Sequence, residues 1–256
     1  MASIGATDAI IVRRTGKGWA IYLNTLFDKY AKQRAEKFGG ASYRSLLDNL
    51  LARAAGLRPA IEVLSADGKR LAQAQVARYH FGDAEILAIV KENVAVEGIG
   101  GQDGVTVYAD AGMGQVARQE ITVKLPRKLY VTDVRSGKRL GYTDVIHSSV
   151  VVGDALVLGL SPTENTIKLS GPGKATLGEH PSFTVTSTEP GRRLIRSHVF
   201  APDGSMLTLY ASNVLLDKGA TTIVLPSALN DAAGVYTLRA TDVVTGATAE
   251  ARITLK

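Results

Sequence analysis

The feature that most constrains this fold is a long series of short apolar segments separated by turn residues, running from residue 58 to the C-terminus. The segments are about four to eight residues long, which is the usual length of a β-strand. Glycine, aspartate, serine and proline stand between them, as in 66–69 and 202–205, and these residues favour turns. Repeated short strands and turns are typical of β-sandwich domains, so the chain is predicted to be mainly β.

The strand pattern divides into two predicted β-sandwich domains. In the first, 58–162, strands are expected at 61–63, 76–81, 86–90, 105–108, 120–125, 129–131 and 155–158. In the second, 163–256, they are expected at 183–186, 198–200, 206–210, 222–225, 234–240 and 249–255. About seven strands in about 90 residues is the size of an immunoglobulin-like sandwich. The chain contains no cysteine, so this sandwich would lack the disulfide of antibody domains.

Residues 1–57 have a different pattern, that of a short α/β segment. The runs 9–12 and 19–23 flank 15–18, whose glycines permit the positive φ of a hairpin turn. A first helix is expected to present Leu26, Phe27, Tyr30 and Ala31 on one face and to end at Gly39-Gly40. A second helix is expected to begin at Ser42 and to present Leu46, Leu47, Leu50, Leu51 and Ala54. Because these apolar faces need cover, 1–57 is predicted to be a partial domain that self-associates or packs on the β domains.

The charge distribution argues against a nucleic-acid partner. The formal net charge is +6, but residues 1–57 alone hold nine Lys or Arg against four Asp or Glu, an excess of five. Beyond this segment the basic and acidic residues nearly cancel and form no run. Nucleic-acid proteins concentrate basic residues along a groove with stacking aromatics, so no nucleic-acid partner is predicted.

No targeting or membrane segment is expected in the sequence as written. The first residues lack the basic and apolar regions of a signal peptide. No apolar run reaches the roughly 20 residues that span a bilayer. The chain is therefore expected to stay in the cytoplasm where it is made, although a longer parent protein could be exported.

The four histidines are the obvious candidates for general bases, and they are His80, His147, His180 and His198. None lies in an H-E-x-x-H motif, so no metal site is predicted. His147 follows Asp144 and precedes Ser148, which invites a Ser/His/Asp interpretation, but neighbours on an extended chain point to opposite faces. No G-x-S-x-G elbow occurs. His147, Asp144 and His80 remain the weak catalytic candidates.

Two glycine-rich stretches, 98–104 and 171–176, resemble phosphate-binding loops. The first lacks the G-x-G-x-x-G spacing and leads into a predicted strand. The second lacks the upstream glycine of a P-loop, and Ala175 stands where Ser or Thr would follow the lysine. Both are interpreted as loops between β segments, and no cofactor is predicted.

Carboxylates and aromatics complete the inventory of residues that could form a site. Glu179, Glu189, Asp203, Asp231 and Asp242 are predicted to lie in solvated turns. Aromatic residues that could form a sugar platform are Trp19, Tyr22, Tyr30, Tyr79, Phe81, Tyr130, Tyr210 and Tyr236. Because most alternate in register with core positions, core packing is the favoured interpretation for them.

Two stretches carry a family resemblance. Residues 16–24, and 50–59 at the end of the second helix, resemble the end of the amidotransferase-like trimerisation domain of family 42 β-galactosidases and related multidomain bacterial proteins. Residues 77–83 and 129–138 are similar to the small β domain that follows it there. The resemblance implies that the catalytic carboxylates lie on a preceding barrel, so no catalytic residue is carried over. It also implies that this chain is the C-terminal portion of a larger protein.

Three functions fit this sequence. The leading hypothesis is a non-catalytic accessory or structural region of a carbohydrate-active, glycoside hydrolase-like protein, which contacts glycan, oligomerises or packs on an upstream catalytic domain. The alternative is a small hydrolase of the glycosidase or esterase type, with a site at a domain junction around His147 or His80. The third is a structural or adhesive interaction module that assembles through exposed edge strands.

Overall fold

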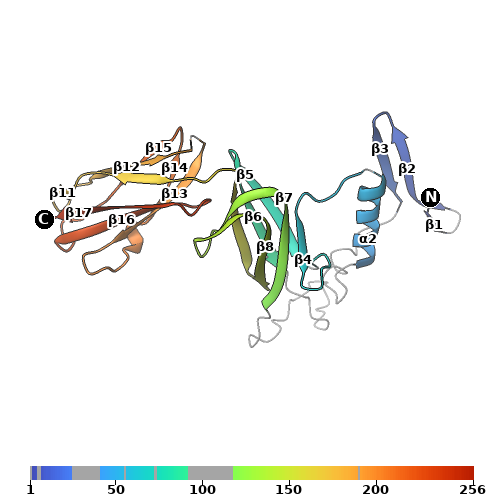
Figure 1. Cartoon of the computed structure of the whole chain (residues 1–256), viewed down its shortest axis with the longest axis horizontal. Coiled ribbons are helices and arrows are strands. Elements are labelled where there is room, and N and C mark those ends of the chain that lie inside the picture. Colours follow the sequence, from blue (N-terminus) through green and yellow to red (C-terminus); the bar gives the residue numbers. More distant parts are fainter. Residues whose placement is uncertain are drawn as a thin grey trace, which may run out of the picture. The chain divides into compact units, whose positions relative to one another are not determined.

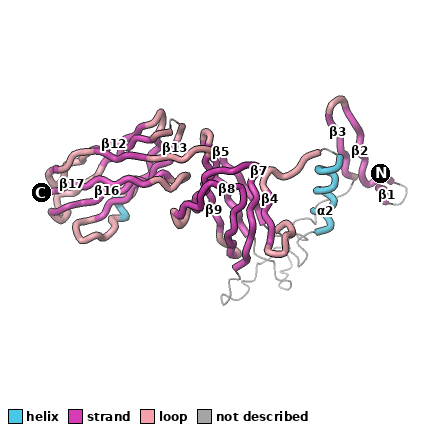
Figure 2. The backbone as a smooth tube through the Cα atoms, viewed as in Figure 1, coloured by secondary structure: helices cyan, strands magenta, loops and turns pink. Residues whose placement is uncertain are grey.

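The computed structural model of the chain describes residues 2–4, 7–24, 41–54, 56–71, 74–91, 118–189 and 191–256. Strands dominate these residues, which confirms the mainly β fold class (Figure 2). The chain forms two compact units. One comprises Met1–Gln75, Val90–Pro126 and His147–Ala155, and the other comprises Val76–Ile89, Arg127–Ile146 and Leu156–Lys256. The division into 1–57, 58–162 and 163–256 stays a prediction.

The predicted N-terminal hairpin is present. Strands β1 (Ala2–Ile4), β2 (Thr7–Thr15) and β3 (Gly18–Leu23) form an antiparallel sheet in that order. Thr15 pairs with Gly18, so two residues make the turn, and Gly16 has the positive φ of 57° that this turn requires.

The second predicted helix is also confirmed. Helix α2 (Ala41–Asn49) begins one residue before the expected cap at Ser42 and continues into the wider turn η1 (Leu50–Ala54). Asp48 on this helix accepts a hydrogen bond from Arg70 at 2.8 Å. The first predicted helix and the glycines at 39–40 lie outside the described residues. No described helix has the length and apolar character needed to cross a bilayer.

The middle of the chain forms one six-stranded sheet (Figure 1). Its order is β4 (Glu62–Ser65), β7 (Arg118–Asp133), β9 (Ala155–Ser161), β6 (Ala84–Lys91) and β5 (Ala74–Phe81), and β8 (Lys138–Val151) pairs with β7. Side chains of Leu87, Ile89, Leu158 and Leu160 are almost completely buried. Strands were predicted at the positions of β4, β5, β6 and β9, whereas the expected strand at 105–108 lies outside the described residues.

Two features of this sheet differ from the sequence prediction. Strand β7 is continuous over the two strands expected at 120–125 and 129–131, with Pro126 inside it. Proline lacks an N–H group, so it can lie in a strand only where the ladder needs no donor. Strand β8 was not predicted, because Gly141 and a series of polar residues interrupt its apolar alternation.

The last part of the chain is a two-sheet sandwich. One sheet has the order β10 (Ile167–Ser170), β12 (Ser182–Ser187) and β15 (Ala220–Val224). The other has the order β11 (Lys174–Ala175), β17 (Thr248–Leu255), β16 (Gly234–Asp242), β13 (Arg193–Phe200) and β14 (Ser212–Leu216). Phe183 and Val185 of the first sheet belong to one buried core with Ile195, Leu238 and Ile253 of the second. This confirms the predicted immunoglobulin-like sandwich.

Tyr236 gives this sandwich a tyrosine corner, a hallmark of immunoglobulin-like domains. Its ring is 2% exposed, and its hydroxyl donates a hydrogen bond to the Ala232 carbonyl at 2.7 Å. Burial, followed by the nearby carboxylates of Asp231 and Asp203, raises the pKa of Tyr236. The corner ties the start of β16 to the loop that precedes it without a disulfide.

The strand predicted at 206–210 is wrong. Met206 makes only an isolated bridge with Phe200, and Thr208–Tyr210 form the short 3-10 helix η2. Tyr210 donates to both Asp231 carboxylate oxygens, at 2.7 and 2.9 Å, while Leu209 is 95% exposed. The anchored Tyr210 hydroxyl favours the turn over an extended conformation. Strands β10, β11 and β14 were not predicted, because they are short or carry several polar residues.

Candidate functional site

The first catalytic candidate, His147, is exposed on β8. Its Nδ1 shares a hydrogen bond with Thr122 Oγ1 at 3.2 Å. Asp144 is half-buried three positions earlier on the same strand. Alternation along a strand places residues three apart on opposite faces. Strand β8 therefore does not bring the carboxylate of Asp144 to the imidazole of His147.

The second candidate, His80, lies on β5 with 67% of its side chain exposed. Its Nδ1 is 3.8 Å from Glu85 Oε1 on the neighbouring strand β6. Arg78 holds the same carboxylate more closely, with Nη2 2.6 Å from Oε2. His80 thus lies beside the ion pair that Arg78 and Glu85 already form. Exposed contacts of this kind stabilise a fold only slightly.

The remaining histidines lie in the sandwich. His180 is exposed in the loop before β12, and His198 is half-buried on β13. Burial, followed by the charges of Arg196 and Arg239, lowers the pKa of His198. Within the described ranges, no three His, Asp or Glu side chains lie close enough together to hold a metal ion.

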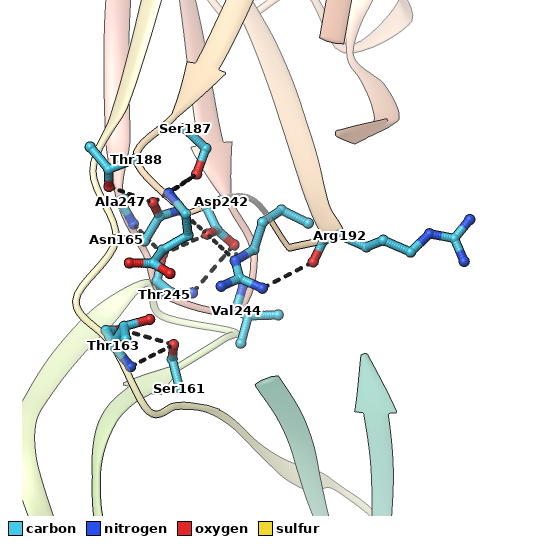
Figure 3. A network of polar contacts seen from close by, with 12 residues as sticks. Ser161, Thr163, Asn165, Ser187, Thr188, Arg192, Asp242, Val244, Thr245 and Ala247 are labelled. Carbon is cyan, nitrogen blue, oxygen red and sulfur yellow. Dashed lines mark hydrogen bonds and ion pairs between the residues drawn. The ribbon is translucent and has the colours of Figure 1, made fainter. Parts of the chain in front are cut away.

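The most developed polar arrangement in the structure centres on Asp242, at the end of β16 (Figure 3). Its side chain is fully buried. Oδ1 accepts hydrogen bonds from the backbone N–H groups of Val244 at 3.0 Å and Thr245 at 3.4 Å. Oδ2 accepts from the Thr245 hydroxyl at 2.8 Å and from Asn165 Nδ2 at 2.7 Å. We call Asp242, Thr245, Asn165, Arg193 and Asp83 the junction network.

Asn165 is the amide member of the junction network, and it is also fully buried. Its Oδ1 accepts hydrogen bonds from Ser187 Oγ at 2.8 Å and from Thr188 Oγ1 at 3.2 Å (Figure 3). The amide therefore joins the end of β12 to the carboxylate at the end of β16. A buried polar group with all of its partners in place fixes a single local arrangement.

Arg193 brings a buried positive charge to the junction network. It begins β13, and its side chain is 0% exposed. Nη1 donates to Asp83 Oδ1 at 3.0 Å and to the Arg192 carbonyl at 3.0 Å, and Nε lies 3.7 Å from Asp242 Oδ2. Asp83 belongs to the turn between β5 and β6 of the middle sheet. The guanidinium thus links that turn to the sandwich.

The turn that follows Asp242 packs closely on the middle sheet. The Thr245 carbonyl accepts hydrogen bonds from Thr132 Oγ1 of β7 at 2.9 Å and from Arg139 Nε of β8 at 3.3 Å. Gly159 of β9 lies so close that a Cβ atom there would be 2.0 Å from the Val244 carbonyl oxygen. The sandwich and the parts of these strands that hold Thr132, Arg139 and Gly159 belong to one compact unit, and the turn is buried inside it.

The junction network is built for structure and not for a reaction. Its two charged groups at the centre are buried and face each other, and its hydroxyl and amide groups are engaged in hydrogen bonds. Nucleophilic catalysis needs a nucleophile and a general base that a substrate can reach. The hydroxyl of Thr245 and the carboxylate of Asp242 are buried and bonded to each other. Removing one partner of such a buried pair leaves an uncompensated charge, which is strongly destabilising.

Asp242 corrects the prediction that the turn carboxylates of this domain are solvated. The prediction holds for Glu179 and Asp203, which are exposed, but Asp242 is 0% exposed. The available signal was the order Asp242-Val243-Val244-Thr245-Gly246, in which an aspartate precedes the threonine and glycine of a tight turn. Aspartate in this position bonds to backbone N–H groups two and three residues later.

The prediction that the aromatics are core residues is wrong for three of them. Trp19 is 50% exposed, Tyr22 is 59% exposed and Tyr79 is 61% exposed. Tyr236 is buried as predicted, and Tyr30 lies outside the described residues. Alternation in a strand does not distinguish the inner from the outer face of a sheet that is covered on one side only.

No family profile and no curated protein matches the chain. Among solved structures, it is similar to the CARDB domain of a Pyrococcus furiosus protein in complex with di-metal ions. The two share 14% identity with a TM-score of 0.26, over 36% of this chain and 87% of the other. It is also similar to the PKD domain of an M14-like peptidase from a Thermoplasmatales archaeon. There the identity is 18% and the TM-score 0.22, over 35% and 92% of the two chains.

Proposed function

We propose that this chain is a non-catalytic structural region, in which the C-terminal sandwich and the adjoining strands of the middle sheet act as one rigid unit. The observation that carries the proposal is the junction network. Arg193 connects Asp83 in the middle sheet with Asp242 in the sandwich, and the turn after Asp242 is bonded to β7 and β8. A region with this construction holds neighbouring parts of a larger protein at a fixed spacing.

The buried charges support rigidity more than they support stability. A buried ion pair contributes little net free energy compared with a well-packed apolar pair of the same shape. Breaking it from one side is different, because the remaining charge stays buried, and the loss is about 3–5 kcal/mol. An arrangement in which Arg193 leaves Asp242 would leave two buried charges unpaired, so it is expected to be costly in free energy.

Calorimetric unfolding of the Arg193→Met variant tests this proposal. In the native chain, the sandwich and the adjoining strands should unfold in one cooperative transition. In the variant, Asp83 and Asp242 lose their shared cation, so we expect a separate transition at lower temperature. Arg192→Ala is the matched control, because the Arg192 side chain is exposed and its carbonyl remains in place. If the variant and the native chain unfold alike, the rigid unit does not depend on the junction network.

As the second part of this proposal, the region belongs to a carbohydrate-active protein and contacts glycan. The sequence resemblance at 16–24 and 50–59 supports this, and so does the exposure of Trp19, Tyr22 and Tyr79. Exposed aromatic rings provide apolar faces that sugar rings can cover. Trp19 is the only tryptophan in the chain, so its fluorescence reports on the hairpin alone.

A titration with neutral and acidic polysaccharides tests the glycan part. Binding at the hairpin should shift or quench the Trp19 emission, and the Tyr22→Ala variant, which removes the exposed ring on the opposite face of β3, should weaken the calorimetric affinity. A variant at an exposed tyrosine outside the hairpin, Tyr142→Ala, controls for a general loss of aromatic surface. Unchanged fluorescence and flat calorimetric traces across all glycans would refute the glycan part and leave the structural part untouched.

A further inference from the structure

The outer face of the five-stranded sheet in the C-terminal sandwich carries an ordered set of cations. Along β13, Ile195 and Val199 point into the core, so Arg196, His198 and Phe200 lie on the outer face. The same alternation places Arg239 of β16 and Arg252 of β17 on that face. Lys174 of β11 joins them, because its neighbour Ala175 packs against the core.

The strand register arranges these residues in rows across the sheet. The first row contains Arg196, Thr241 and Thr248. The second row contains His198, Arg239 and Glu250. The third row contains Phe200, Thr237 and Arg252. The fourth row contains Val235, Thr254 and Lys174.

Each row therefore contains one arginine or lysine. From one row to the next, this residue moves to the neighbouring strand, in the order β13, β16, β17 and β11. Arg196, Arg239, Arg252 and Lys174 form a diagonal, which we call the cationic diagonal. Strands are about 4.8 Å apart, and residues on one face of a strand repeat every 6.8 Å or so, which gives steps of about 8 Å. The whole line is about 25 Å long on the same spacing.

Most of the positive charge on the cationic diagonal is not neutralised within the sheet. Arg239 is paired with Glu250 at 2.7 Å, and its guanidinium lies 4.9 Å from the centre of the Phe200 ring. Arg196 donates from Nε to His198 Nε2 at 3.2 Å, and that partner is not an anion. Among the described residues, Arg196, Arg252 and Lys174 have no salt-bridge partner. Four cations against one carboxylate leave an excess of three positive charges on this face.

We propose that the cationic diagonal binds a carboxylated polysaccharide that lies across the strands. Guanidinium groups match carboxylates in a planar, bidentate geometry. The threonines beside the diagonal, Thr237, Thr241 and Thr248, offer hydroxyl groups to neutral parts of a sugar. The inference rests on the glycan part of the proposed function. It adds the class of glycan, a carboxylated polysaccharide, and the surface that binds it, the cationic diagonal.

The other polyanions fit this face less well. Single-stranded nucleic acid requires aromatic rings on which bases stack, but Arg239 covers the ring of Phe200. An extended acidic peptide joins a sheet at its edge, through backbone hydrogen bonds. Three of the four members of the cationic diagonal instead lie on the interior strands β13, β16 and β17, where the backbone groups are already paired, and only Lys174 lies on the edge strand β11.

The test uses the full chain and polygalacturonate, in affinity electrophoresis and calorimetry at low salt. The native protein should bind, and added salt should weaken binding because exposed charges are screened. Removing each arginine contact should weaken binding roughly tenfold, so we expect about a hundredfold loss in Arg196→Ala/Arg252→Ala. The control is Lys128→Ala/Lys168→Ala, which removes two exposed charges from strands of other sheets and should bind as the native chain does.

Competitors decide the chemistry of the ligand. Fully methyl-esterified polygalacturonate should not bind, because its carboxylates are blocked. Tighter binding to polyglutamate or to oligo(dT) would overturn the proposal. The proposal would also fail if the native protein does not bind polygalacturonate, or if Arg196→Ala/Arg252→Ala binds it as tightly as the native protein does. If the proposal fails but neutral glycans still change the Trp19 fluorescence, the glycan part of the proposed function stands. If no glycan binds, both the proposal and the glycan part are refuted.

Discussion

Among single residues, Asp242 receives the largest share of the hydrogen bonds in the junction network. Four donors and the guanidinium of Arg193 converge on its two oxygens. Asp242→Ala removes all of these contacts and leaves Arg193 and Asn165 buried without them. We expect a loss of about 3–5 kcal/mol in the free energy of unfolding. Urea denaturation measures it, and Asp217→Ala is a control at an exposed aspartate of the same domain. A loss below about 1 kcal/mol, typical of a surface site, would contradict the role given to Asp242.

His198 makes a separate prediction about pH at the residue scale. Its pKa in the folded chain is lowered below the ordinary value of 6.5 by burial, Arg196 and Arg239. On acidification, the imidazole of His198 therefore takes up a proton at a higher pH in the unfolded chain than in the folded chain. The folded state should lose stability as the pH falls below about 6.5. Above that value both states carry a neutral imidazole, and the effect disappears.

The His198→Gln variant checks the pH prediction by denaturation at several pH values. It should show a smaller loss of stability on acidification than the native chain, with little difference at pH 8. His180→Gln, at an exposed histidine, provides the comparison. If His198→Gln follows the native pH profile, neither burial nor the two arginines lowers the pKa of His198 in the folded chain.

At the scale of elements, the fit between β9 and the turn after β16 depends on Gly159. A Cβ atom at Gly159 would lie 2.0 Å from the Val244 carbonyl oxygen, so Gly159→Ala must displace backbone. We expect a loss of about 1–3 kcal/mol or more, as for an overpacked core. Gly173→Ala is a matched control, because a Cβ atom there meets nothing within 4 Å and its φ is not positive. Equal unfolding midpoints for the two variants would show that the turn is not tightly packed on β9.

The elements also show which parts of the fold could be predicted. Strands with a buried face, such as β12, β16 and β17, were found because their apolar alternation is strong. Strand β8 was missed because Gly141 and several polar residues interrupt its apolar alternation. The segment at 206–210 has the composition of a strand, but the bond from Tyr210 to Asp231 turns it into η2. Long-range contacts of this kind are not visible in local patterns.

The candidate sites were less predictable for the same reason. Asp83 and Arg193 are 110 positions apart, and the sequence around each residue gives no signal that the two form an ion pair. The cationic diagonal is likewise a product of register, since its members lie on four strands that the sequence separates by turns. In contrast, the catalytic candidate His147 was chosen from its sequence neighbours Asp144 and Ser148, whereas its hydrogen-bond partner in the structure is Thr122, 25 positions away.

At the scale of the whole molecule, the central claim is that the C-terminal sandwich and the adjoining strands of the middle sheet open together. Hydrogen exchange measured by mass spectrometry, at increasing denaturant below the unfolding midpoint, tests it most directly. Peptides from β9 and from the end of β16 should then give the same opening free energy in the native chain. In Arg193→Met they should separate, with β9 opening first or the sandwich opening first. Different opening free energies for the two peptides in the native chain would contradict the claim.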